Sequence, residues 1–165
     1  MKKFNLFLSA LVLLMSIGFT NSTLAETIAK CKNPAGYSNY HYAGLIDKKG
    51  SGFVEDKITG GMTTLIKINE KEYDILFTDI RKQIFSVRDD GGKVMLMRLG
   101  KNDATFLHMH PGMVMEIYTF YRETDGEGRF DMLQSKGGDG MPIHKSSVLT
   151  GSCSELNIDS LYPQD

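Results

Sequence analysis

One short stretch of the chain has two histidines before a turn and two methionines after it, and these side chains are the best suited to chemistry. His108 and His110 come before a Pro-Gly pair, and Met113 and Met115 come after it. Neutral imidazole nitrogen and thioether sulfur are ligands for soft cations such as Cu(I) and Ag(I). This stretch is therefore a candidate metal site, provided that the surrounding elements bring the side chains together.

The position of these side chains depends on the turn that the Pro-Gly pair forms. A two-residue turn between antiparallel strands places His108 opposite Met115 on one face of the hairpin. A four-residue turn before the first strand then places Met95 of the preceding strand beside His108. The sequence thus predicts a Cu(I) or Ag(I) site at Met95, His108 and Met115, with His110 and Met113 in support.

Methionine also fills irregular cores and lines adaptable apolar cavities, so these residues have a second interpretation. The chain contains 10 Met among 165 residues, which fits a packed interior as well as a metal site. We favour core or cavity lining here. We therefore expect no resident cofactor unless it is Cu(I).

The same histidines, together with Glu116 and His144, resemble the cupin pattern. In that pattern two His and one Glu of a first motif meet a His of a second motif. The resemblance covers residues 106–144 and implies a metal-dependent enzyme with His108, His110, Glu116 and His144 as ligands. Five residues separate His110 from Glu116, which is more than cupins usually have. Only a three-residue turn would return Glu116 to the face of the histidines.

The common catalytic motifs are absent from the sequence. It has no GxSxG elbow, Walker loop, HExxH pair or EF-hand loop, so the usual routes to nucleophilic, nucleotide or Ca²⁺ chemistry lack their residues. The formal net charge is -1 and no long run of like charges occurs. Because nucleic-acid binding depends on a basic surface, a nucleic-acid partner is disfavoured.

Short stretches rich in β-branched, aromatic and Met residues alternate with turn-forming residues through most of the chain. This pattern predicts an all-β fold, an antiparallel up-and-down meander of about 8–10 strands. We expect a small closed barrel, lipocalin-like in architecture, or a two-sheet sandwich. Residues 26–52 read as an irregular lead-in and 154–165 as a tail. The predicted strands are 53–59, 62–68, 72–78, 83–88, 93–99, 104–110, 113–122, 128–136 and 142–150.

The N-terminal residues 1–25 are typical of a signal peptide. Lys2 and Lys3 precede an apolar stretch at 6–19, and a small-residue pattern ends at Ala25. Cleavage there leaves one β domain, residues 26–165, without a membrane span. We expect it in the bacterial periplasm or secreted.

Two cysteines, Cys31 and Cys153, stand near the two ends of that domain. An oxidising compartment favours a disulfide bond between them over a metal or redox role. The function that these observations favour is that of an exported, non-catalytic binding protein. Its ligand would be a small apolar molecule or an envelope protein, which includes an inhibitor or immunity-type role. The alternative is a periplasmic Cu(I)- or Ag(I)-binding protein.

Overall fold

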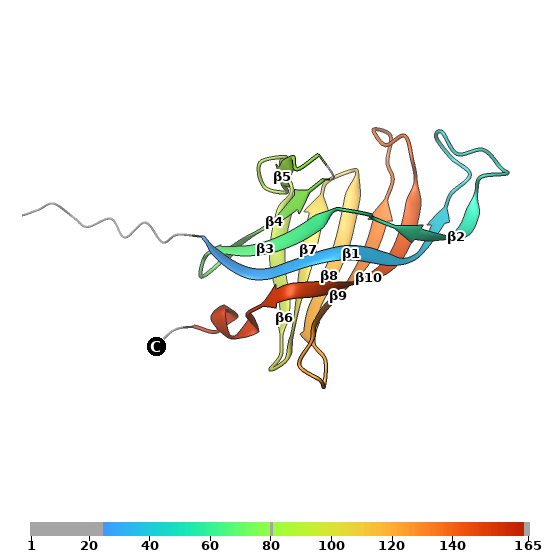
Figure 1. Ribbon diagram of the computed structural model, residues 1–165. Helices are drawn as coiled ribbons and strands as arrows, with labels where there is room; N and C mark the ends of the chain where they lie inside the picture. Colours follow the sequence, from blue (N-terminus) through green and yellow to red (C-terminus); the bar gives the residue numbers. More distant parts are fainter. Residues whose placement is uncertain (1–24, 80, 164–165) are drawn as a thin grey trace, which may run out of the picture.

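The computed structural model describes residues 25–79 and 81–163, and strands dominate it (Figure 1). The predicted signal peptide, apart from Ala25, lies outside the described residues. The predicted antiparallel all-β fold is confirmed. In chain order the elements are β1 (Glu26–Tyr40), β2 (Gly52–Lys57), β3 (Met62–Asn69), β4 (Glu72–Thr78), β5 (Ile84–Ser86), β6 (Lys93–Leu99), β7 (Asp103–His110), β8 (Val114–Arg122), β9 (Gly128–Lys136), β10 (Lys145–Leu156) and the short 3-10 helix η1 (Ile158–Leu161).

All ten strands belong to one curled sheet. Its order is β5-β4-β3-β1-β10-β9-β8-β7-β6, and β2 pairs with the C-terminal part of β1, residues 35–40. The segments β3–β5 and β6–β10 are meanders, as predicted, but β1 lies between β3 and β10. The sheet is a half-barrel rather than a closed barrel or a two-sheet sandwich, because no pairing of described residues joins its end strands β5 and β6.

The prediction of an irregular lead-in at 26–52 was wrong, because most of it is the long strand β1. This strand pairs with β10 along one edge and with β3 and then β2 along the other. Its inward positions in the second half include Gly36 and Ser38, which carry no apolar signal. A Cβ on Gly36 would lie 2.2 Å from the carbonyl oxygen of Val148, so close pairing with β10 excludes larger residues.

The prediction of a tail at 154–165 was also wrong. Strand β10 continues to Leu156, and η1 follows it with Ile158 and Leu161 buried. The ammonium of Lys67 donates a hydrogen bond of 3.0 Å to the carbonyl oxygen of Ser160. The end of the chain thus closes one side of the core. The sequence did not indicate η1, because this helix is short and has only two buried apolar residues.

The predicted disulfide between Cys31 and Cys153 is present. The two residues face each other directly in the β1–β10 pairing and are separated by 122 residues along the chain. Cys31 is buried in the core. The bond therefore joins the first and last strands at the centre of the sheet.

Aromatic rings from β4, β7, β8 and β9 fill one end of the curl. Phe106 lies edge-on to Tyr73, with ring centroids 5.1 Å apart, and packs against Phe120. Tyr118, Phe120 and Phe130 stack on one another. Burial of these large apolar surfaces away from water stabilises the fold at this end, while the other end of the curl stays open.

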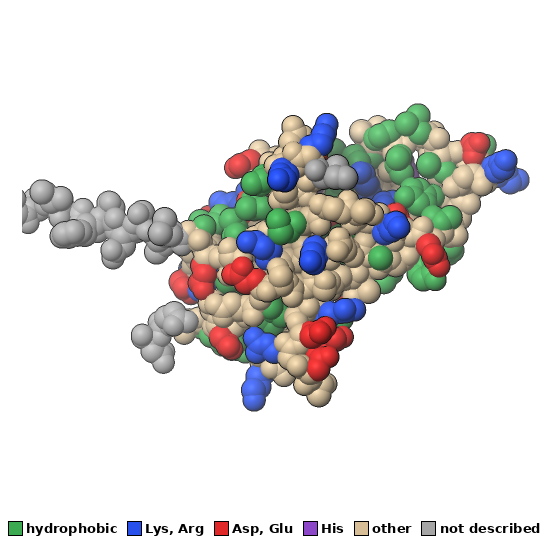
Figure 2. Space-filling model, viewed as in Figure 1, with side chains coloured by type: hydrophobic (Ala, Val, Ile, Leu, Met, Phe, Trp, Pro, Cys, Tyr) green, Lys and Arg blue, Asp and Glu red, His purple; other side chains and the backbone are tan. Residues whose placement is uncertain are grey.

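The outer surface bears charges of both signs. Figure 2 shows Lys and Arg side chains interspersed with Asp and Glu over the face in view, without a stripe of one sign. Within the described part of the chain, no helix has the length and apolar character needed to cross a membrane.

Candidate ligand-binding site

The turn between β7 and β8 has three residues rather than two. The pairing places His108 opposite Glu116, and His110 opposite Val114. The amide of Met113 donates to the carbonyl of His110 across the turn, and Gly112 has a φ of 77°, in the left-handed region that favours glycine. The prediction of a two-residue turn was therefore wrong. A shift of one residue moves every side chain of β8 to the other face.

This register separates the predicted metal ligands Met95, His108 and Met115. Met95 pairs with Leu107 because a β-bulge between Leu96 and Arg98 shifts the β6–β7 pairing. Met95 and Met115 are 39% and 49% exposed on the outer face, whereas His108 is 7% exposed on the inner face. The structure does not bring these three side chains together.

The cupin-like set is only partly assembled. Glu116 does return to the face of His108, but its carboxylate accepts a hydrogen bond from Nδ1 of that histidine at 2.8 Å. His144 donates instead to the carbonyl of Met141 at 3.0 Å. Among the described residues, the only group of three or more His, Cys, Asp or Glu side chains close enough for one ion is exposed, in the β8–β9 turn, and comprises Glu123, Asp125 and Glu127.

The inner face changes from apolar to polar along the strands. One cross-strand row contains Phe106, Tyr118, Met132 and Leu149, all buried. The next row, one step toward the open end, is polar and runs through five strands, from β7 to β1. Its members are His108, Glu116, Gln134, Ser147 and Ser38. This polar row forms the floor of the open end.

Glu116 is the centre of one half of the polar row. Its carboxylate accepts hydrogen bonds from His108, from the hydroxyl of Tyr118 at 2.6 Å and from the amide of Gln134. Burial alone would raise the pKa of Glu116, but these three hydrogen bonds and the attraction of His108 outweigh it and lower the pKa. Burial, and then the same carboxylate, raise the pKa of Tyr118, which stays a donor. Glu116 is thus a buried, ionised carboxylate at neutral pH.

Asp56 is the centre of the other half. It lies opposite Gly36 in the β1–β2 pairing. It accepts hydrogen bonds from Ser38 at 2.6 Å, Tyr40 at 3.2 Å and Lys145 at 2.8 Å. Burial raises the pKa of Asp56, but the hydrogen bonds from Lys145, Ser38 and Tyr40 and the positive charge of Lys145 lower it overall.

The two halves meet through a pair of serines. The hydroxyls of Ser38 and Ser147 lie 2.7 Å apart, and Ser147 lies 3.5 Å from the amide oxygen of Gln134. The single proton of Ser38 is donated to Asp56, so Ser147 donates to Ser38. The row is therefore hydrogen-bonded in two parts, one from Ser147 to Asp56 and one around Glu116, which meet at the 3.5 Å contact of Ser147 with Gln134.

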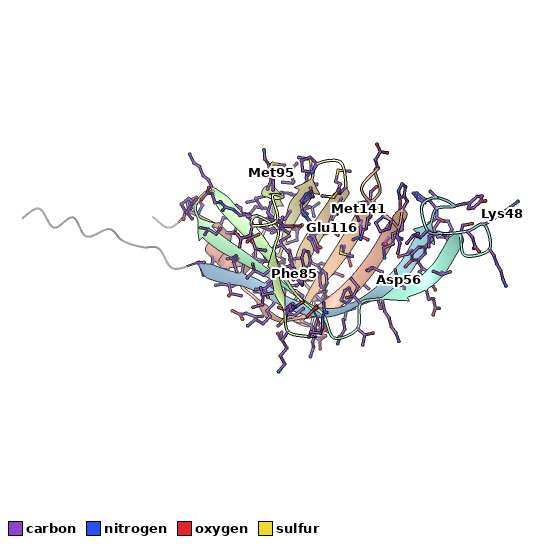
Figure 3. The ribbon with its side chains drawn as sticks, turned by 90° about the horizontal axis from the view of Figure 1, so that it is seen from above. Lys48, Asp56, Phe85, Met95, Glu116 and Met141 are labelled. Atoms are coloured by element: carbon purple, nitrogen blue, oxygen red, sulfur yellow. A yellow bond between two sulfur atoms is a disulfide. The ribbon has the colours of Figure 1, made fainter. Side chains whose placement is uncertain are left out.

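A cavity of about 460 Å³ lies above this floor, between it and strands β3–β5. Its walls are mainly apolar and include Ile58, Met62, Phe77, Phe85 and Met132. Figure 3 shows Phe85 and Glu116 within the trough of the curled sheet. A volume in this range is typical of sites for small organic ligands.

Two carboxylates and no basic side chain line the described part of this cavity. Glu116 lies on its floor and Asp79 at its edge. The backbone amides of Gln83 and Arg81 donate to Asp79, and the pKa of Asp79 is lowered, first by the Gln83 hydrogen bond. The Arg81 guanidinium pairs with Asp79, with Nε 3.1 Å from Oδ2, and offsets its charge. Glu116 is therefore the carboxylate that makes the cavity electronegative at neutral pH.

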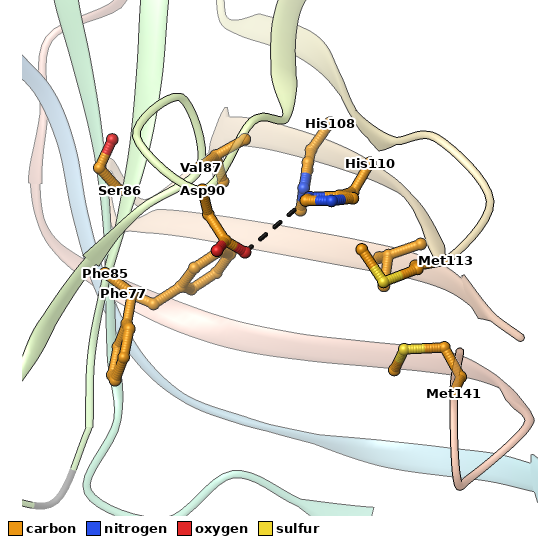
Figure 4. A pocket seen from close by; sticks show the side chains of 10 residues that line it. Phe77, Phe85, Ser86, Val87, Asp90, His108, His110, Met113 and Met141 are labelled. Atoms are coloured by element: carbon orange, nitrogen blue, oxygen red, sulfur yellow. Dashed lines mark ion pairs between the residues drawn. The ribbon is translucent and has the colours of Figure 1, made fainter.

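A second, smaller cavity of about 190 Å³ adjoins the first and shares Phe77 and Phe85 with it. Its lining includes His108, His110 and Met113, together with Met141 from the β9–β10 loop (Figure 4). Three of the predicted metal ligands are thus in one cavity. Met141 is a fourth soft side chain that the sequence interpretation missed.

The polar row was also missed, apart from His108 and Glu116. Gln134, Ser147 and Ser38 carry no motif, and only the register identifies them. A three-residue turn between β7 and β8 would have revealed the row. With that turn the numbers of paired residues add to 224, as for His108 and Glu116, and polar residues then align across neighbouring strands.

No protein-family model, curated protein or solved structure was found to match the chain.

Proposed function

We propose that this chain is an exported binding protein that holds a small, mostly apolar molecule in the larger cavity. The observation that carries the proposal is the combination of apolar walls with a buried ionised carboxylate, Glu116, in a cavity of about 460 Å³. Apolar walls provide affinity, and a few polar groups orient the ligand.

The charges of the cavity favour one class of ligand. Glu116 uses three acceptor positions for His108, Tyr118 and Gln134, whereas a carboxylate offers roughly four. One position is therefore open to a donor on the ligand. Because Glu116 is ionised and no Lys or Arg is in the described lining, a neutral or cationic head group is favoured over an anionic one.

The environment of the histidine supports binding rather than catalysis. The one hydroxyl among the described residues that line the smaller cavity beside His108 is that of Ser86. It donates to Asp74 at 2.5 Å, so its proton is directed away from the histidine. A nucleophile needs its base within hydrogen-bond reach, and this arrangement does not provide one.

Isothermal titration calorimetry with two ligands of the same apolar body tests the charge preference. We expect 1-naphthylmethylamine to bind the purified protein and 1-naphthoate to bind more weakly. Glu116→Gln should reduce the difference between them, because the open acceptor is then uncharged. Equal affinity for both ligands in the wild type would contradict the proposed head group. No binding of either ligand, with no copurifying molecule in native mass spectrometry, would contradict the proposed function.

A matched pair of variants on β5 tests the location. Phe85 lines the cavity, whereas its neighbour Ile84 is 67% exposed on the opposite face. Phe85→Ala should weaken binding of 1-naphthylmethylamine by about 1 to 2 kcal/mol, the value of the lost apolar contact. Ile84→Ala should leave the affinity unchanged. Equal effects of the two substitutions would place the ligand elsewhere.

A further inference from the structure

The smaller cavity contains a soft donor set that differs from the one predicted from the sequence. It is lined by imidazoles of His108 and His110 from β7, and by thioethers of Met113 and Met141 from two loops. In Figure 4 the side chains of Met113 and Met141 face each other below the two histidines. None of these four side chains lines the larger cavity.

The two loops that carry the methionines are held against each other. Between the loops, the amide of Gly137 donates to the carbonyl of Met113 at 2.9 Å. Within the β9–β10 loop, the amide of Met141 donates to the carbonyl of Gly138 at 3.0 Å and closes a turn. A Cβ on Gly138 would lie 1.9 Å from the carbonyl oxygen of Gly112, so glycine is required for this contact. The backbone therefore fixes the positions from which both thioethers enter the cavity.

Each histidine has Nδ1 turned toward a carboxylate. For His108 the distance from Nδ1 to Glu116 is 2.8 Å, and for His110 the distance from Nδ1 to Asp90 is 3.9 Å. The first distance is that of a hydrogen bond, so His108 donates through Nδ1 and keeps the lone pair of Nε2 free for a metal, whereas the second distance exceeds hydrogen-bond length. Carboxylates in this role orient the ring and increase its basicity at known metal sites.

We propose that His108, His110, Met113 and Met141 form a binding site for one Cu(I) ion, with two nitrogen and two sulfur donors. Thioether and imidazole ligands select this soft cation over Mg²⁺ or Ca²⁺, which prefer oxygen. Both cysteines of the chain are in the disulfide, so no thiolate competes for the metal. Ag(I) has the same ligand preferences and serves as a redox-inert probe.

The experiment is a titration of Cu(I) into the purified protein in a reducing buffer, in competition with bathocuproine disulfonate. We expect one Cu(I) per chain. Loss of a hydrogen bond that supports a metal ligand lowers metal affinity roughly 10- to 100-fold. The variant Met113→Leu/Met141→Leu loses two ligands themselves, so its Cu(I) affinity should fall by at least this factor. The matched control, Met95→Leu/Met115→Leu, removes two exposed methionines of the outer face and should bind Cu(I) as the wild type does.

Several results would overturn this site. They are the absence of stoichiometric Cu(I) binding, an equal loss in both double variants, or a copper X-ray absorption spectrum without sulfur ligands. Circular dichroism verifies that each variant is folded. If the double variant is unfolded, Met141→Leu alone tests the site, because it is a conservative change in a loop. Binding of 1-naphthylmethylamine should persist in the Met113→Leu/Met141→Leu variant, so failure of the copper site is separable from failure of the proposed function.

Discussion

Glu116 is the residue on which the chemistry of the inner face depends. It is 5% exposed and yet ionised, because three donors surround its carboxylate. The candidate residues His108 and Glu116 could be identified from the sequence, since imidazole and carboxylate are chemically distinctive. Their mutual contact could not, because it depends on a single extra residue in the turn between β7 and β8.

The lowered pKa of Glu116 predicts a pH dependence of stability. A carboxyl group with a lower pKa in the folded state stabilises the fold above its ordinary value of 4.5, and this contribution is lost as the pH falls through the folded-state pKa. Glu116→Gln should therefore lower the free energy of unfolding at neutral pH by about 1 to 3 kcal/mol. The difference from wild type should shrink below about pH 4.5.

Urea denaturation of both proteins from about pH 7 to about pH 3 measures this difference. A difference that stays constant or increases as the pH falls would show that the Glu116 charge is not stabilised by its neighbours.

At the scale of the elements, alternation of side chains along each strand decides which residues can share a site. Strands β3, β4 and β6–β9 could be predicted within about one residue, because apolar residues alternate clearly between turn formers. Strand β1 could not, since its inward positions include Gly36 and Ser38, which pack against β10 without apolar side chains. Bulges such as that between Leu96 and Arg98 also leave no clear sequence signal.

Two leucines on opposite faces test the strand orientation. Leu149 of β10 is 1% exposed on the inner face, and Leu133 of β9 is 47% exposed on the outer face. Leu149→Ala should lower the free energy of unfolding by about 2 to 5 kcal/mol, because it leaves a cavity in the core. Leu133→Ala should cost less than about 1 kcal/mol. Thermal or urea denaturation compares them, and a reversed order would refute the assignment of faces.

At the scale of the whole molecule, the first and last strands join the sheet at its centre. The β1–β10 pairing and the Cys31–Cys153 disulfide hold together parts of the chain that are 122 residues apart. The disulfide could be predicted from cysteine count and the expected compartment. The β1–β10 pairing itself could not, because pairing between distant segments is not encoded in local periodicity.

Removal of the disulfide should destabilise the whole fold. In the chain-entropy model a closed loop of this length contributes about 4 to 5 kcal/mol. We therefore expect Cys31→Ser/Cys153→Ser to lower the free energy of unfolding by about 2 to 5 kcal/mol, measured by urea denaturation without reductant. A double variant as stable as the wild type would show that β1–β10 pairing alone suffices to join the termini.

The central claim is that an apolar molecule with a donor head lies in the larger cavity, against Glu116 and Gln134. The most direct test is a two-dimensional ¹H–¹⁵N NMR titration of the labelled protein with 1-naphthylmethylamine, in which the side-chain amide of Gln134 reports on the cavity floor. We predict saturable shifts of that amide and of the backbone amides of Met132 and Phe77. Shifts confined to outer-face residues such as Val148 and Tyr37, or no shifts at saturating ligand, would contradict the account.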